Sequence, residues 1–236
     1  MTSFSKFTKS FALGAMLVFF ICGSSVFAQL VAFTGKDSNS PDEFAFVALQ
    51  DISDGTMIFF TESDYDNTAG TFSTAGGGTE GTLVFTVSGT LTTGTVVQIS
   101  ETAANTFTVT GNPGTATIVG GNDWSATASD PHYAYSSSTP GSPWSDVDEV
   151  HAMLFASNSA FGTRDPSTGT FPHPNAIVVD NGFSGASIIA VDFTGDRTSA
   201  THVTLADSTN FTEGDGTFDL TFFDSVPVEL TSFSIQ

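Results

Sequence analysis

Basic residues and cysteine are scarce in this sequence, and both shortages limit what the protein can be. It has 5 Lys and Arg residues against 25 Asp and Glu residues, so its formal net charge at pH 7 is −20. Nucleic acids and anionic membrane surfaces attract proteins through basic patches, so this composition argues against both as partners. The single cysteine, Cys22, excludes an internal disulfide and a metal site built from several cysteines.

The first 28 residues have the three parts of a cleavable signal peptide. Lys6 and Lys9 make a basic start, Phe11 to Ile21 is an apolar run, and Val26 to Ala28 is a small-x-small cleavage site before Gln29. The apolar run is too short for a membrane span, which needs about 20 residues. We therefore expect export, with no membrane insertion after cleavage and a secreted or cell-surface location.

Cleavage at this site changes the chemistry of the chain that remains. Cys22 would be lost with the signal, and its bulky predecessors do not match the small residues that precede an acylated cysteine. The basic residues left would be Lys36, Arg164 and Arg197. The mature protein is thus expected to be disulfide-free and strongly acidic, as suits a soluble extracellular protein. Its roughly 200 residues can bury a sufficient core without disulfides.

Short runs of alternating or continuous apolar residues separated by turn residues indicate an all-β fold. Glu43–Leu49 is apolar on both faces and is expected to be a central strand. The predicted strands are 30–33, 43–49, 57–61, 82–87, 96–100, 106–110, 132–135, 150–155 (strand or short helix), 176–179, 187–193, 202–205, 217–223 and 228–235. We predict one antiparallel β-sandwich over 29–225 with a loop-rich middle at about 120–175, followed by a terminal strand or linker at 226–236.

Two stretches resemble known families. The first comprises Val31–Gly35, Pro41–Leu49, Asp51–Thr56, Ile58–Thr61, Glu80–Phe85 and Gly94–Val97. It is similar to an uncharacterised domain of secreted bacterial surface proteins and to the lamin-tail type of immunoglobulin-like sandwich. This resemblance implies a β-sandwich and brings no catalytic residues with it.

The second stretch is Val226–Phe233, which contains the letters PVELTSF. It is similar to the segment that precedes the C-terminal sorting domain of type IX secretion cargo, which implies transport to the cell surface. The sequence stops at Gln236, where such a domain would begin. Either the sequence is truncated, or the protein stays in the periplasm or leaves by another route.

No catalytic motif stands out. The glycine-rich run 76–81 lacks the lysine of a phosphate-binding loop and precedes a strand, so we interpret it as a loop. The four histidines lack a zinc-binding spacing, and no nucleophile elbow of the form Gly-x-Ser-x-Gly is present. We therefore expect no catalytic residues and no required cofactor, although an enzyme is not excluded.

Two acidic loops suggest calcium as an alternative. Asp64 and Asp66 in one loop, and Asp146 and Asp148 in another, offer alternating oxygen ligands of the kind that Ca²⁺ prefers. Neither loop has the glycine and final glutamate of an EF-hand. Solvated acidic turns are the competing interpretation.

Aromatic residues raise a second question. The chain has 24 Phe but only 2 Trp and 3 Tyr, and Trp124, Tyr133, Tyr135 and Trp144 gather in the predicted loop-rich middle. Exposed rings on loops stack on sugars, whereas rings that anchor loops over a core are the commoner case. The abundant Phe is expected to form the core.

These observations leave two functional classes open. The first is a non-catalytic module for adhesion, matrix formation or display, with surface proteins as partners. The second is a carbohydrate-binding or hydrolytic accessory domain that acts on extracellular glycan. A calcium-stabilised structural domain is compatible with either.

Overall fold

The protein was analysed as a computed structural model, which describes residues 29–66, 68–72, 81–121, 124, 127–128, 130–158, 173, 175–214 and 217–226. The predicted signal peptide, the glycine-rich run 76–81 apart from Gly81, most of the predicted loop at 162–174, and the segment 227–236 lie outside these residues. Within the described part, no helix is long and apolar enough to cross a membrane.

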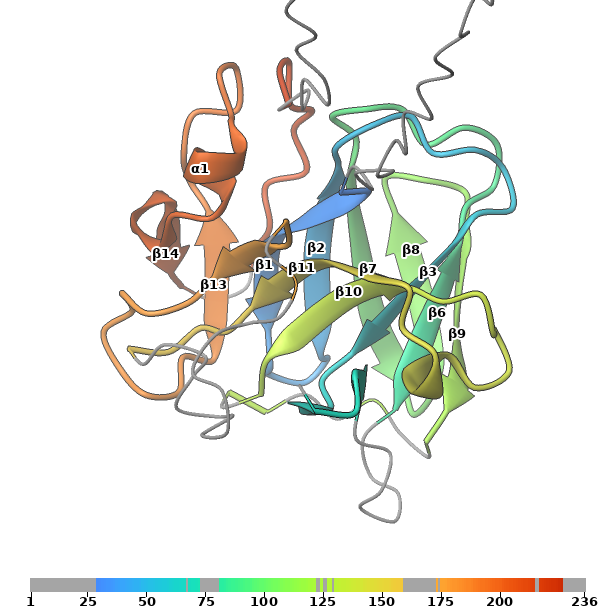
Figure 1. Ribbon diagram of the computed structural model, residues 1–236. Coiled ribbons are helices and arrows are strands. Elements are labelled where there is room, and N and C mark those ends of the chain that lie inside the picture. Colours follow the sequence, from blue (N-terminus) through green and yellow to red (C-terminus); the bar gives the residue numbers. More distant parts are fainter. Residues whose placement is uncertain are drawn as a thin grey trace, which may run out of the picture.

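Two six-stranded sheets face each other (Figure 1). The first, sheet A, has the order β14-β13-β1-β2-β7-β8. Its strands are β1 (Val31–Asp37), β2 (Glu43–Ala48), β7 (Val96–Ala103), β8 (Thr106–Thr110), β13 (Ala190–Phe193) and β14 (Phe211–Glu213). All its neighbouring strands are antiparallel, and β2 lies between β1 and β7 as a central strand.

The second sheet, sheet C, has the order β12-β11-β10-β3-β6-β9. Its strands are β3 (Met57–Thr61), β6 (Thr82–Thr86), β9 (Thr115–Gly120), β10 (His132–Ser136), β11 (Glu149–Leu154) and β12 (Ile177–Val179). Its pairs are antiparallel except β11–β12, which is parallel. The predicted all-β sandwich is confirmed, and this one pair makes sheet C mixed.

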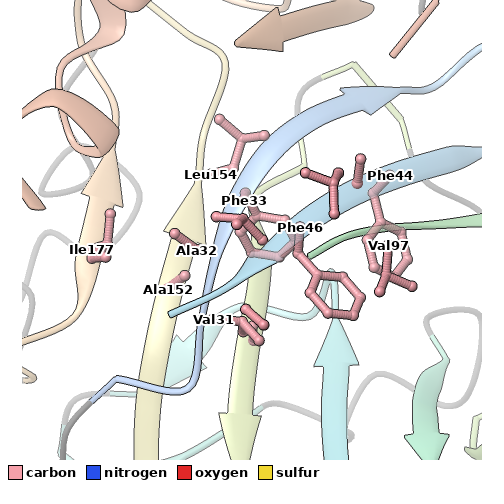
Figure 2. Close-up of a cluster of buried hydrophobic side chains, with 14 of the residues drawn as sticks. Val31, Ala32, Phe33, Phe44, Phe46, Val97, Ala152, Leu154 and Ile177 are labelled. Carbon is pink, nitrogen blue, oxygen red and sulfur yellow. The ribbon is translucent and has the colours of Figure 1, made fainter. Parts of the chain in front are cut away.

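Phenylalanine fills the space between the sheets, as its abundance predicted. Phe46 of sheet A lies 5.1 Å from the Phe60 ring and 5.6 Å from the Phe85 ring of sheet C, between ring centroids. Phe33 and Phe44 complete the cluster, and all five rings are buried. Figure 2 shows Phe33, Phe44 and Phe46 beside the smaller side chains of Ala152 and Leu154 from the opposite sheet. Such interlocking rings are a large part of the hydrophobic stabilisation of the fold.

The outer faces of both sheets are also covered. On sheet C, a hairpin of β4 (Tyr65–Asp66) and β5 (Thr71–Phe72) places Phe72 4.9 Å from the Tyr133 ring, and a second buried cluster forms there. On sheet A, the segment 217–226 packs Phe218 against Gly35 of β1, where an added Cβ would lie 2.6 Å from the ring. Part of the outer face of each sheet is therefore covered by apolar side chains.

Two predicted elements differ. The segment 202–205 was predicted as a strand, but His202–Leu205 is a one-turn helix, α1. Thr201 and Thr204 cap it reciprocally, because each side chain accepts the backbone N–H of the other residue. The predicted strand at 217–223 is extended chain that belongs to neither sheet.

Candidate functional site

Three of the four predicted sugar-stacking rings are buried. Trp124 is 2 % exposed, and Tyr133 and Tyr135 are fully buried. Trp124 packs 5.3 Å from the Phe44 ring inside the sandwich, whereas the tyrosines of β10 lie beneath the β4–β5 hairpin. A sugar cannot stack on a ring that has no accessible face, so the stacking interpretation is wrong for these three. They are core residues, which was the competing interpretation.

Trp144 is different because it is half-buried. It lies in a short 3₁₀ helix, η1 (Pro143–Ser145), and its ring covers Gly120 at the end of β9 so closely that an added Cβ would lie 1.9 Å from the ring. Trp144 therefore anchors η1 to the edge of sheet C. A single anchored ring gives at most one stacking surface.

The acidic residues predicted to bind calcium are exposed and take part in turns. Asp66 Oδ1 accepts the backbone N–H groups of Thr68 and Ala69 at 2.8 and 3.0 Å. Asp146 Oδ2 accepts the hydroxyls of Ser138 and Thr139, and Asp148 Oδ1 lies 3.4 Å from the same Ser138 hydroxyl. These hydroxyl bonds lower the pKa of Asp146.

Within the described ranges, no group of three or more His, Cys, Asp or Glu side chains comes together in a way that would hold a metal ion. Calcium binding at Asp64, Asp66, Asp146 and Asp148 stays a prediction. If calcium binds there, the melting temperature of the protein should be higher in millimolar calcium than in EDTA. Identical melting curves would contradict this prediction.

Many carboxylates form the same local turn. Asp196 Oδ1 accepts both the N–H and the hydroxyl of Thr198, at 2.8 and 2.7 Å, and Asp207 does the same with Thr209, at 2.9 and 2.7 Å. In both cases the bonds lower the pKa of the carboxyl group. Much of the acidity of the chain thus serves loop geometry.

Both described basic residues are buried. Lys36 is fully buried, and its Nζ donates to the carbonyl oxygens of Thr127, Ala128 and Asp130 at 3.5, 3.2 and 3.2 Å. Arg197 is 8 % exposed and contacts the segment 217–226. The third basic residue of the predicted mature chain, Arg164, lies outside the described residues. The described surface therefore exposes carboxylates and no Lys or Arg charge.

One groove opens at the end of sheet A. Ser40, Pro41 and Asp42 before β2 face the end of β7 and the β7–β8 turn, and together with Glu101–Ala104 they enclose about 430 Å³. Asp42 and Glu101 are joined by a backbone hydrogen bond, since Glu101 N–H donates to Asp42 O at 2.9 Å. Glu101 Oε1 also accepts the N–H of Asn105 at 2.8 Å, which orients its carboxylate. Two carboxylates, two hydroxyls and a small apolar patch line the groove.

A second polar cluster lies partly buried beside β11. Tyr65 Oη and His173 Nε2 are 2.8 Å apart, and His151 Nδ1 lies 3.2 Å from Gln29 Oε1. Burial lowers the pKa of His151 to about 3 and raises the pKa values of Tyr65 and Glu149. Both histidines are therefore neutral at pH 7, and Tyr65 keeps its proton. This cluster lacks the lowered tyrosine pKa that an activated nucleophile would need.

The sequence signals for these features were unequal. The scarcity of Lys and Arg marked Lys36 and Arg197 as unusual, but their burial depends on distant segments. The Asp42–Glu43 pair at the start of a strand was visible in the sequence, whereas its partner Glu101 follows only from the pairing of β2 with β7.

Comparisons with known proteins give no further guidance. No protein-family model, no curated protein and no solved structure matches the chain. The functional conclusion therefore rests on the residues and geometry described above.

Proposed function

We propose that the chain is a secreted or cell-surface β-sandwich module without catalytic activity, which acts in adhesion, matrix formation or display. The observation that carries this proposal is that the charged side chains of the described residues make structural contacts. Lys36 and Arg197 hold distant segments on the sandwich, and carboxylates such as Asp196 and Asp207 stabilise local turns. Such an arrangement suits a stable display module.

Export rests on the signal-peptide pattern, and type IX transport rests on the Val226–Phe233 resemblance. Both are tested by expressing the full-length gene in its own cells and fractionating them. Surface labelling and the N-terminal sequence of the recovered protein should give a mature chain that starts at Gln29, outside the inner membrane. A chain that keeps its first 28 residues in the cytoplasm would contradict this part of the proposal.

Adhesion is tested with the purified mature protein coated on beads or wells. Cells or extracellular matrix should bind coated surfaces more strongly than surfaces coated with an unrelated acidic protein of similar charge. Equal binding to the two surfaces would mean that negative charge alone explains the binding, and it would overturn the adhesion proposal.

The groove favours a second candidate, glycan binding. Carboxylates and hydroxyls hydrogen-bond sugar hydroxyls, and 430 Å³ lies in the usual range for small-ligand sites. Because the surface is acidic, the glycan expected here is neutral or cationic. Binding on a glycan array that is lost in Asp42→Asn and Glu101→Gln, and kept in the distant Asp224→Asn, would support this candidate. Array binding that is unchanged in both groove variants would reject the groove.

A further inference from the structure

The segment 217–226, here called the strap, is held to sheet A by one arginine, which makes three contacts with the strap and one with β13. Arg197 Nη1 donates to the carbonyl oxygen of Thr221 at 3.1 Å, and its Nε lies 3.3 Å from Asp219 Oδ2. Its guanidinium lies 4.6 Å from the centre of the Phe223 ring, a cation–π distance. Its Nη2 donates to the carbonyl of Phe193 at 3.2 Å, which fixes the arginine to β13.

The strap covers an apolar face but shares little backbone bonding with it. Phe218 sits on Gly35, and Phe223 is buried and donates its N–H to Gly94 O at 2.9 Å. Ala45 of β2, which is the ladder partner of Gly35, is fully buried. Regions with few backbone hydrogen bonds to the rest of a fold open at lower free energy than its paired strands.

The strap takes no part in the strand ladders. At Gly214, just after β14, an added Cβ would meet nothing within 4 Å. Neither sheet needs the strap for its strand pairing, since every ladder is formed by β1 to β14. Departure of the strap from sheet A would therefore leave the strand pairing of both sheets in place.

Two carboxylates share the single guanidinium. The Asp192 carboxylate of β13 contacts the strap through a hydrogen bond from the backbone N–H of Asp219, and its Oδ1 is buried with no hydrogen-bond partner. Arg197 and Asp219 are the charged groups that act on it, and its strand neighbours Gly35 and Thr212 are uncharged. Burial raises the pKa of Asp192 to about 6. The Arg197 charge and hydrogen bonds from the backbone N–H groups of Asp219 and Phe193 oppose this rise, and the Asp219 charge adds to it.

We propose that residues 217–226 form a pH-sensitive strap that opens as a unit while the sandwich stays folded, with Arg197 as its latch and Asp192 as its sensor. The open strap uncovers the apolar outer face of sheet A together with Phe218 and Phe223. Because the pKa of Asp192 is raised in the closed state, closure favours the protonated form of Asp192. Closure of the strap is therefore strongest at acid pH. Above pH 6, a half-buried carboxylate becomes charged beside Asp219, and closure weakens.

Hydrogen exchange of the mature protein, followed by mass spectrometry and corrected for intrinsic rates, tests this directly. Strap amides should exchange faster than those of β2 at every pH. The opening equilibrium of the strap should rise by up to about tenfold from pH 5 to pH 7.5, as expected for a pKa moved from near 4 to near 6 on a half-exposed group. An apolar dye should bind more at pH 7.5 than at pH 5.

Three variants separate the latch from general stability. Asp192→Asn should abolish the pH dependence of strap exchange, because Asn does not titrate. Arg197→Met should raise strap exchange well above that of β2. Asp224→Asn, an exposed strap carboxylate, should behave like the parent protein.

Strap exchange that matches β2 exchange in the parent would mean that the strap opens only by global unfolding, which overturns the proposal. A pH dependence that persists in Asp192→Asn would overturn the sensor. Each result is independent of adhesion or glycan binding.

Discussion

Lys36 Nζ lies 3.2 Å from the carbonyl oxygen of Asp130, 94 residues further along the chain. This contact closes the interior beside β1 with the loop that leads into β10, and it removes one of the few positive charges from the surface. The nearby His132 is also fully buried, and burial together with the Lys36 charge holds its pKa well below the usual value. Lys36 thus holds a loop in place, and its charge adds to the effect of burial that keeps His132 neutral.

Replacing Lys36 with Met should lower the free energy of unfolding by about 2 kcal/mol, because three carbonyl oxygens in a part-buried site lose their donor. The apolar stem is retained, so the loss reports the ammonium group. Chemical denaturation measures the change, and hydrogen exchange should show less protection around 127–130. Equal or higher stability in Lys36→Met would mean that the cost of burying the charge exceeds its bonds.

Gly35→Ala should destabilise the protein by about 2 kcal/mol, because the new methyl group would lie 2.6 Å from the Phe218 ring and 2.8 Å from Val191 O. Gly141→Ala is the matched control, since nothing lies within 4 Å of an added Cβ there. Thermal melting of the two variants should differ clearly. Equal melting temperatures would show that Phe218 does not pack against β1 in solution.

Trp124→Ala should cost about 3–5 kcal/mol of stability, as expected for emptying a buried aromatic site. Trp144→Ala should cost less, because that ring is half-buried. Urea unfolding of both variants gives the comparison. A larger loss for Trp144→Ala would contradict the assignment of Trp124 to the core.

Acid should unfold the protein through its turn carboxylates. The pKa values of Asp51, Asp146, Asp196 and Asp207 lie below the ordinary value of 3.8 because each carboxylate accepts hydrogen bonds. A lowered pKa gives stability that is present above pH 4 and is lost as the pH falls through the folded-state pKa. The melting temperature should therefore drop below pH 4, and scanning fluorimetry across a pH series measures it.

The acid transition has an internal control. In Asp196→Asn the side chain keeps an acceptor oxygen but no longer titrates, so this variant should lose less stability on acidification than the parent. The raised pKa of Asp192 acts in the opposite direction, because its contribution is lost as the pH rises through about 6. A melting temperature that does not change between pH 5 and pH 2.5 would contradict this account.

Alternation in the sequence predicted the strands well where both faces are buried. Glu43–Leu49 was predicted as a central strand, and β2 is central. β9 was not predicted, because the Thr, Ala and Gly residues of Thr115–Gly120 give a weak apolar signal. The segment 202–205 looked like a strand, but the bonds between Thr201 and Thr204 stabilise a helical turn instead.

The candidate sites were harder to predict because burial depends on segments far apart in the sequence. Tyr133 and Tyr135 were correctly placed on a strand, yet the hairpin that covers them comes from residues 65–72. The spacing within 124–144 carries no information about that hairpin. In the same way, no local pattern links Arg197 to a strap that begins twenty residues later.

The burial of Lys36 and Arg197 also has a consequence for proteolysis of the folded domain. Trypsin-like enzymes need an accessible Lys or Arg side chain, and the described surface offers none. Amine-reactive crosslinkers likewise find no exposed lysine there. Within the described residues, burial of both cations therefore removes the side chains that trypsin-like enzymes recognise.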